Sequence, residues 1–361
     1  MALWILFLGF MLFGGIAAII YLVTRFHKFS FIKNIPNKKL SWFVAAIPVL
    51  LLMCIGFYEV FTMGVVLLHL ALFFILSDIG FAIYYRVSGK ERGGKYWGGL
   101  VAIIVTVIFM TGAFIAAFSI SRTHYEFDSP KDVGDIRIVM IADSHLGVTL
   151  SGKRFAEQME RIDAENADAL IIAGDFVDDN AVKSDIVTAC EALGRMKTPV
   201  YFVWGNHDRG YYNYREVSGE QLATMLRDNS VTILMDESEL IDNRFYIVGR
   251  EDFSHVERAP LEDLLDPLDH SRYIISVDHQ PVEFDKEAEC GADIVLSGHT
   301  HGGHVWPSGY FGYWFGTNDG IWGLYDHGDT HCIVTSGISG WAIPFKTGTH
   351  SEYVIIDVHG T

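Results

Sequence analysis

The stretch Gly298-His299-Thr300-His301-Gly302-Gly303-His304 holds two imidazoles one residue apart between glycines. It directly follows the apolar run 294–296, which predicts a buried strand that ends in a tight glycine loop. A loop at a strand end with paired histidines is well suited to hold a metal ion. Histidine-rich turns also lie on protein surfaces, so this stretch alone favours neither interpretation.

Other segments share this organisation, in which an apolar strand ends in Asp, Asn or His. Apolar runs predict strands over 136–141, 169–173 and 199–204. Apolar residues at helical spacing predict helices over 153–165 and 182–195, after the first two of these strands. The soluble half of the chain therefore begins with strand–loop–helix units.

The strands expected further along the chain look more like hairpins. They are 245–248, 273–277, 294–296, 332–335 and 353–358. Helical units first and mostly β pairing later predict an α+β domain of two packed mixed β-sheets flanked by helices.

Five strand ends together supply a set of oxygen and imidazole ligands without thiolate. The set is Asp143, His145, Asp175, Asn206, His207, His279, His299 and His301. Such ligands suit Mn²⁺ first, with Fe or Zn²⁺ as alternatives, better than Ca²⁺ or Cu(I). Eight are too many for one ion, so two divalent metal ions that share a carboxylate are expected. Two metals ~3.5–4 Å apart are the usual device for in-line attack on phosphorus.

Charge is unevenly distributed along the 361 residues, whose net charge is -17. Residues 1–122 hold ten Lys/Arg and three Asp/Glu, whereas residues 123–361 hold seventeen Lys/Arg and forty-one Asp/Glu. So acidic a second half excludes nucleic acid as an expected partner, because phosphate contacts need clustered cations. The four cysteines show no CxxC pattern. A Cys290–Cys332 bridge ranks below free buried thiols.

The first third of the chain predicts a four-span transmembrane anchor, residues 1–124. Its apolar runs are 3–24, 42–58, 60–85 and 97–119. Each is long enough as a helix to cross ~30 Å of hydrocarbon, the second only just. The first lacks the basic start and the cleavage site of a signal peptide. Residues 125–134 are expected to be a linker, and 135–361 the catalytic domain.

The loops 25–41 and 86–96 carry the basic residues of the anchor, so the positive-inside rule places both in the cytoplasm. An even number of spans then predicts a multi-pass protein of the cell membrane with its C-terminal domain on the extracytoplasmic side. Asp78 lies within the third run. Either it has a function in the membrane, or, as we prefer, it snorkels or pairs with Arg86.

Five ordered blocks carry a resemblance to a known family. They are Asp143-x-His145, Gly174-Asp175-x-x-Asp178, Gly205-Asn206-His207-Asp208, His279 and Gly298-His299-x-His301. In this order they resemble the blocks of the calcineurin-like metallophosphoesterases, over about residues 136–358. With the membrane anchor, the Gly-His-Thr-His-Gly-Gly form is most similar to the bacterial membrane-associated branch, which includes the group called transmembrane proteins with metallophosphoesterase domain.

The resemblance implies a role for each matched residue. Asp143, His145 and His301 would hold the first metal, Asn206, His279 and His299 the second, and Asp175 would bridge the two. His207 would contact the phosphoryl group and protonate the leaving oxygen, while Asp178 would orient that imidazole. A hydroxide bridging the metals would be the nucleophile, without a covalent intermediate. Asp208 is expected to be structural or a partner of Arg209.

Two positions depart from the branch. It has Gln where His304 stands and Arg near Lys346. His304 is either an extra phosphate donor or a surface residue, and Lys346 offers charge without a bidentate fork. Both departures affect substrate identity rather than metal chemistry.

Residues 304–325 are rich in aromatic side chains and glycine. They form either a hairpin packed on the sheet or a wall of the site that dips into the lipid interface. The expected partners are the membrane lipid bilayer and a lipid-linked or envelope phosphoester substrate. The expected function is hydrolysis of a phosphodiester or pyrophosphate bond. The alternatives are a lipid phosphomonoesterase and a non-catalytic membrane sensor or binding protein, and the second of these predicts missing ligands.

Overall fold

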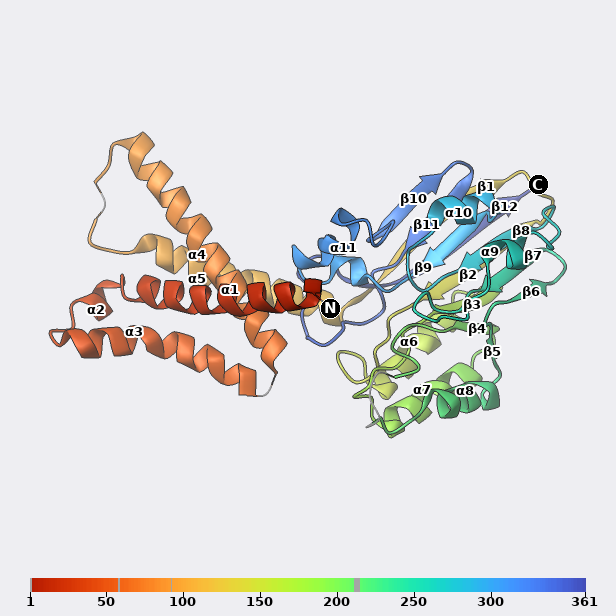
Figure 1. Cartoon of the computed structure of the whole chain (residues 1–361), viewed down its shortest axis with the longest axis horizontal. Coiled ribbons are helices and arrows are strands. Elements are labelled where there is room, and N and C mark those ends of the chain that lie inside the picture. The colour runs from red at the N-terminus through yellow and green to blue at the C-terminus, as the bar shows by residue number, and fades with distance from the viewer. Residues whose placement is uncertain (1, 58, 92, 211–214) are drawn as a thin grey trace. The chain divides into compact units, whose positions relative to one another are not determined.

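The computed structural model describes the chain except residues 1, 58, 92 and 211–214, and it leaves aside the side chains of 2–12 and 308. The chain divides into two compact units, Met1–Ala113 and Phe114–Thr361. Figure 1 labels the elements of both units.

The first unit consists of helices. They are α1 (Ala2–Phe26), α2 (Ser30–Lys33), α3 (Lys38–Met53), η1 (Cys54–Phe57), α4 (Val60–Ser88) and α5 (Trp97–Phe118), whose last turn belongs to the second unit. Among the described residues, three helical segments are long and apolar enough to cross a membrane: Lys38–Phe57, Val60–Ser88 and Trp97–Phe118. The part of α1 whose side chains are described, Phe13–Phe26, is a shorter apolar helix.

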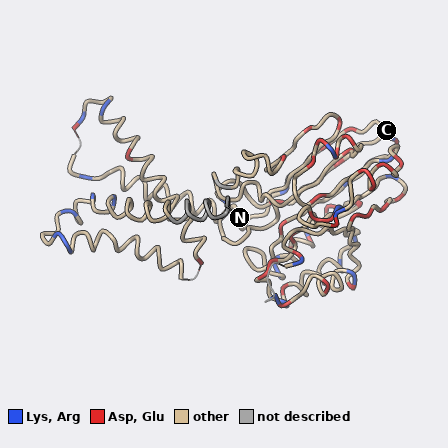
Figure 2. The backbone as a smooth tube through the Cα atoms, in the orientation of Figure 1, with Lys and Arg blue, Asp and Glu red and all other residues tan. Residues whose placement is uncertain are grey.

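Asp78 in α4 pairs differently from the expectation. Its carboxylate lies 3.2 Å from Arg25 Nε and 3.4 Å from Lys28 Nζ, and it accepts a 2.6 Å hydrogen bond from the Tyr96 hydroxyl. The expected pairing with Arg86 is therefore replaced by one with Arg25 and Lys28. Through Asp78, these contacts join Lys28, between α1 and α2, to Tyr96, just before α5. The two basic loops, 25–41 and 86–96, therefore lie at the same end of the first unit (Figure 2).

The second unit contains two six-stranded sheets. The first has the order β1 (Ile120–Ser129), β12 (Ser351–Gly360), β2 (Asp135–Ile141), β3 (Ala169–Ala173), β4 (Val200–Val203), β5 (Val231–Ile233). The second has the order β10 (Gly323–His327), β11 (Thr330–Val334), β9 (Ile294–Ser297), β8 (Tyr273–Val277), β7 (Phe245–Gly249), β6 (Glu237–Ile241). Both are mixed sheets.

Strand alternation divides the core into layers. In β2, Ile138 and Met140 pack between the two sheets, whereas Val139 and Ile141 face the helices on the outer side. Those helices are α6 (Gly152–Asp163), α7 (Lys183–Gly194) and α8 (Gly219–Asp228); α9 (Leu261–Leu265) and α10 (Phe284–Glu289) cover the second sheet (Figure 1). The prediction of two mixed sheets flanked by helices is confirmed.

Two details of the predicted fold are wrong. β7, β8, β9 and β11 pair in parallel rather than as hairpins, and only β6–β7 and β10–β11 of this sheet are antiparallel. Most of the expected linker 125–134 is not a linker either, because residues to Ser129 belong to β1. This strand pairs in parallel with all of β12, and its exposed and half-buried side chains alternate as an edge strand requires.

The register places the start of β1 at the edge of the first sheet where β2 ends. Ile120 pairs with Ser351 at the start of β12, and β12 runs antiparallel to β2, with Val354 opposite Met140. The first residues of β1 and β12 therefore lie beside the end of β2, where the loop with Asp143 begins. The last turn of α5 is attached here, since Ser351 Oγ donates to the Ala117 carbonyl (2.9 Å).

Candidate metal centre

The ligand-bearing loops follow strands that end at one edge of the two sheets. Five of the candidate ligands have positive φ although none is glycine: Asp143 (φ 54°), His145 (φ 35°), Asp175 (φ 52°), His299 (φ 69°) and His301 (φ 50°). Such conformations are costly outside glycine and gather at functional sites. The surrounding strands and their buried core hold them in place.

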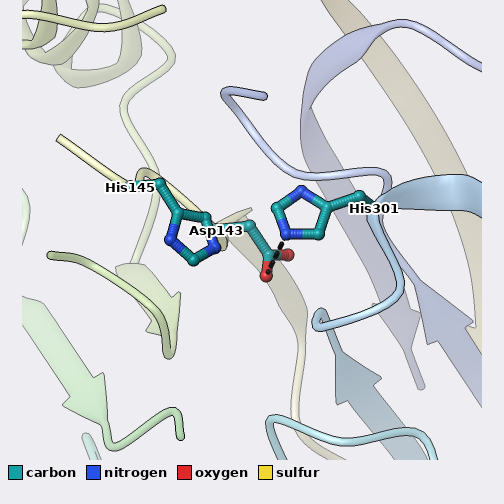
Figure 3. A group of neighbouring side chains, drawn as sticks. All are labelled: Asp143, His145 and His301. Atoms are coloured by element: carbon teal, nitrogen blue, oxygen red, sulfur yellow. Dashed lines mark ion pairs between the residues drawn. The ribbon is translucent and has the colours of Figure 1, made fainter. Parts of the chain in front are cut away.

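One ligand group consists of Asp143, His145 and His301. Their ligand atoms all lie within 4.8 Å of one another, and Figure 3 shows the three side chains pointing toward one another. The His301 Nε2 atom lies 3.6 Å from Asp143 Oδ1. The Asp143 carboxylate also accepts the backbone N–H of His299 at 3.0 and 3.1 Å, which ties the β2 loop to the β9 loop.

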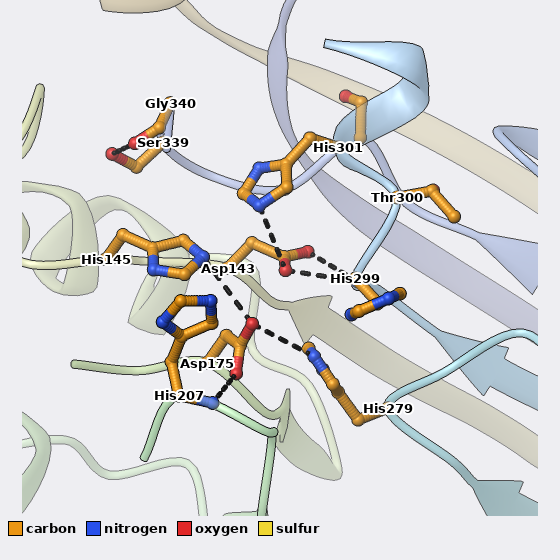
Figure 4. Close-up of polar contacts among 12 residues, drawn as sticks. Asp143, His145, Asp175, His207, His279, His299, Thr300, His301, Ser339 and Gly340 are labelled. Carbon is orange, nitrogen blue, oxygen red and sulfur yellow. Dashed lines mark hydrogen bonds and ion pairs between the residues drawn. The ribbon is translucent and has the colours of Figure 1, made fainter. Parts of the chain in front are cut away.

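A second group consists of Asp175, His279 and His299, again with ligand atoms within 4.8 Å. Asn206 joins it, with Oδ1 2.9 Å from His299 Nδ1. Asp175 Oδ2 lies 3.1 Å from His279 Nε2 and 3.5 Å from His145 Nε2, so it reaches both groups (Figure 4). The structure thus brings together all seven residues predicted to bind metal.

The hydrogen bonds of these residues fit a pair of cations. Nδ1 of His279 lies 2.7 Å from the Ala173 carbonyl, so it carries the proton and the Nε2 lone pair points at Asp175. Two lone pairs facing each other need a proton or a metal ion between them. Among the described residues, His279 Nε2 and His145 Nε2 are buried without a hydrogen-bond partner, and both lie within 3.5 Å of Asp175 Oδ2. Buried nitrogens of this kind are expected where ions bind.

Burial and neighbouring charges act in opposite directions on the two central carboxylates. Burial raises the pKa of Asp143 to about 6, although the charges of His279 and His145 oppose it. Burial alone would raise the pKa of Asp175 as well. The charges of His279 and His145, together with the hydrogen bond of His279, outweigh burial and hold this pKa below the usual range. Asp175 is therefore anionic at neutral pH. A cation bound at Asp143 would favour its ionised form as well.

Asp178 lies between two imidazoles rather than beside one. Its Oδ1 lies 3.6 Å from His207 Nδ1, and its Oδ2 lies 3.4 Å from His145 Nδ1. Burial opposes the charge of Asp178, yet the hydrogen bonds of His145 and His207 lower its pKa. Burial lowers the pKa of His207, but Asp178 and Asp175 outweigh it, so the net shift is upward. The imidazole of His207 therefore retains its proton to higher pH, as a proton donor requires.

Asp208 fixes the two loops that carry Asp175 and Asn206. Its Oδ2 accepts from the backbone N–H groups of Asp175 and Gly205, both at 2.9 Å, and its Oδ1 from those of Phe176 (2.8 Å) and Val177 (3.1 Å). The carboxylate is completely buried. This matches the structural alternative for Asp208, because Arg209 pairs with Glu251 instead.

The two departures from the family pattern are both buried. Lys346 Nζ donates to the carbonyls of Ser336 (2.6 Å) and Gly337 (3.2 Å), and burial lowers its pKa to about 7. It therefore binds the loop beside the site instead of presenting its charge. The ring nitrogens of His304 are buried 5.4 Å (ring to ring) from His301, so the surface alternative is wrong. Its role as a phosphate donor stays a prediction.

Two features of the site were not predicted. Trp341, in the loop after β11, lies 5.7 Å ring to ring from His207. Arg250 is buried behind His279, with Nη1 3.2 Å from Glu287 and 3.3 Å from Asp278. The order Asp278-His279 was visible in the sequence, but its distant cationic partner was not.

Two mixed sheets with paired Asp/His groups at one edge define a metal-dependent hydrolase. The family model described as calcineurin-like phosphoesterase matches residues 136–303. An uncharacterized metallophosphoesterase of Aquifex aeolicus is 30% identical over 237 residues, which cover 63% of this chain and 86% of that protein. The chain belongs to the calcineurin-like phosphoesterase family and is a metal-dependent phosphoric ester hydrolase.

Another relative is similar over a larger part of the chain, and solved structures match as well. A Danio rerio protein described as a transmembrane protein with metallophosphoesterase domain is 28% identical over 322 residues, covering 83% of this chain and 70% of that protein. Among solved structures, phosphopantetheinyl hydrolase from Mycobacterium tuberculosis matches with a TM-score of 0.38 and 15% identity, covering 58% of this chain and 91% of that chain.

Proposed function

We propose that this chain is a membrane-anchored phosphodiesterase or pyrophosphatase with two metal ions, acting on a lipid-linked or envelope substrate. The observation that carries the proposal is the place of Asp175. Its Oδ2 lies within 3.5 Å of one histidine from each ligand group, as a bridging carboxylate would. A sensor with a degenerate site would lack such ligands.

In this proposal Asp143, His145 and His301 hold one ion and Asn206, His279 and His299 the other, with Asp175 shared. We expect Mn²⁺ first, with Fe or Zn²⁺ as alternatives, because the ligands are oxygen and imidazole nitrogen. Two such ions lower the pKa of water, so that hydroxide is available near neutral pH, and they neutralise charge that develops on the phosphoryl oxygens.

His207 is the proposed proton donor to the leaving oxygen. Its raised pKa keeps it protonated, and the contact of its Nδ1 with Asp178 fixes the ring orientation. Asp178 is a positioning residue, and it holds His145 by the same carboxylate. The proton donor and one metal ligand thus share a single support.

The anchor is proposed to cross the membrane four times with the helices that end at Phe118, α1 being the additional span, and residues 120–361, which include β1, form the proposed catalytic domain. Both basic loops meet at one end of the helical unit, which supports placing that end in the cytoplasm. The catalytic domain would then be extracytoplasmic, and the chain is proposed to belong to the bacterial membrane-associated branch. Protease treatment of intact cells should remove the domain, and a fully protected domain would contradict this orientation.

Two observations support a substrate held near lipid. The last turn of α5 joins the sheet at the edge that carries the ligand loops. Residues 305–318 contain no charged residue and form short helices, η3 (Ser308–Tyr310) and α11 (Phe311–Trp314). Trp306, Trp314 and Phe315 are exposed on this segment, as expected of a surface in contact with the lipid interface.

The decisive test measures hydrolysis by the full chain in detergent micelles. Bis-p-nitrophenyl phosphate and p-nitrophenyl phosphate are compared with Mn²⁺, Fe²⁺ and Zn²⁺, beside His207→Ala and Asp175→Asn. We expect diester cleavage that depends on Mn²⁺ and falls at least about 100-fold in His207→Ala. Faster monoester cleavage would favour a lipid phosphomonoesterase. No turnover with any ion would favour a sensor or binding protein.

A further inference from the structure

Trp341 presents a large apolar surface next to the proposed proton donor. Its indole lies 5.7 Å from the His207 ring at an interplanar angle of 60°, and 43% of the residue is exposed. The neighbouring residues Ser339 and Ile343 are buried, so the indole is presented by a well-packed loop. A rigid aromatic ring held at the edge of a polar site offers a contact surface for an apolar ligand group.

Four residues after Trp341, the same loop reaches the end of α5. The Phe345 ring lies 6.1 Å from that of Phe114, and Phe114 lies 4.4 Å from Phe118. The Arg154 guanidinium lies 5.3 Å from the Phe118 ring and donates to the Phe118 carbonyl at 2.9 Å. All these residues belong to the second compact unit. The loop that presents Trp341 beside His207 therefore also contacts the last turn of α5, through Phe345.

The other side of the centre is polar. Asp252 is buried near the second ligand group, where its charge acts on His279 and His299, and it accepts a 3.0 Å hydrogen bond from Gln280. Glu251 beside it pairs with Arg209. An alkyl chain on that side would lie against buried charged groups rather than against apolar side chains. A bound phosphoester would therefore have an apolar surface, Trp341, at one end and charged groups, such as Asp252, at the other.

We propose that the apolar, lipid-like part of the substrate is the leaving group, and that it packs on Trp341 with its chain directed along Phe345 and Phe114. This inference rests on the proposed function, because His207 marks the side on which the leaving oxygen departs. The bond between phosphorus and that oxygen breaks, and a bond from phosphorus to the oxygen of water forms. A proton passes from His207 to the leaving oxygen, the attacking water releases a proton to solvent, and His207 is protonated again from solvent. The polar part retains the phosphoryl group.

Two isomeric diesters test this assignment. In one, the leaving nitrophenol carries an octyl chain and the retained group is ethyl. In the other, the octyl chain is on the retained group and the nitrophenol is plain. Both partition similarly into the micelles that hold the full chain, so the ratio of their kcat/KM values, corrected for the chemical rates of the two phenols, reports where the chain binds.

We expect the wild type to favour the isomer with the octyl leaving group by about tenfold, the effect of removing roughly two methylene groups from water. Trp341→Ala should bring the ratio to within about threefold of unity, and Trp341→Phe should keep most of it. Leu240→Ala, which shortens an exposed apolar side chain on β6, is the matched control and should keep the wild-type ratio.

The outcomes separate the two proposals. If the wild type cleaves both diesters with a ratio near unity, or favours the retained octyl chain, the leaving-group assignment is wrong and the phosphodiesterase stands. If the ratio is high but unchanged in Trp341→Ala and in Trp341→Gln, Trp341 is not the contact surface. If neither isomer nor bis-p-nitrophenyl phosphate is cleaved, the proposed function itself fails.

Discussion

Substituting Asp208 with asparagine should weaken both the fold and the metal centre. The carboxylate is buried, and each of its oxygens accepts two backbone N–H groups, at 2.8–3.1 Å. In Asp208→Asn, one oxygen becomes an NH₂ group that cannot accept hydrogen bonds, so two buried N–H groups lose their acceptor. Each such loss costs about 1–3 kcal/mol, which gives about 4 kcal/mol in total. For a unit of this size, that corresponds to a fall in Tm of roughly 10 °C.

The assay is thermal unfolding of the full chain in detergent, followed by near-UV circular dichroism, with metal content measured on the same samples. Asp329→Asn is the matched control, because Asp329 lies exposed in the turn between β10 and β11. Bound metal should fall in Asp208→Asn but not in the control, since the lost bonds hold the backbone either at Asp175 or at the two residues that follow it. A Tm within about 2 °C of the wild type, with full metal content, would refute this account of Asp208.

Three further results are expected. Chelation of the metal should lower the stability of the catalytic unit by about 3 kcal/mol at a free ion concentration near 100 times Kd, measured as a fall in Tm that Mn²⁺ restores. Gly174→Ala should lower metal content and Tm, because the residue has φ 81° and a Cβ there would lie 2.5 Å from His279 Nδ1. The hydrogen bond from Arg137 holds the pKa of Asp357 at about 2, so this pair stabilises the fold above about pH 4 and loses its effect as the pH falls toward 2. Arg137→Met should therefore cost about 1 kcal/mol at pH 7, after solvent screening, and almost nothing near pH 2 in chemical unfolding.

The convergence of these Asp, Asn and His side chains was predictable because it depends on local order in the sequence. Each ligand follows a short apolar run, and strands in one sheet that run the same way deliver their ends to one edge. The two predicted helices of this unit, 153–165 and 182–195, correspond to Gly152–Asp163 and Lys183–Gly194. Each helix is long enough for its apolar residues to show helical spacing in the sequence.

The strand pairing was not predictable, because it depends on distant partners. The connection between β7 and β8 contains only the five-residue helix α9, too short to show helical spacing, so a parallel crossover resembled a hairpin. β1 resembled a linker because its partner, β12, lies more than 200 residues along the chain. The contact of Trp341 with His207 depends on the same kind of distant packing.

Left-handed backbone recurs among the ligands of the site, although non-glycine residues elsewhere, such as Asp236 and Glu283, adopt it too. The left-handed residues at the centre are aspartates and histidines, for which such φ values cost about 1–3 kcal/mol each. These positive φ values could not be predicted from the sequence, because glycine is the residue at which positive φ is normally expected. The cost can be met only where burial and hydrogen bonds fix the loops, as Asp208 does for the loop of Asp175. Loops fixed in this way restrict the ligand side chains, so less conformational freedom is lost when an ion binds.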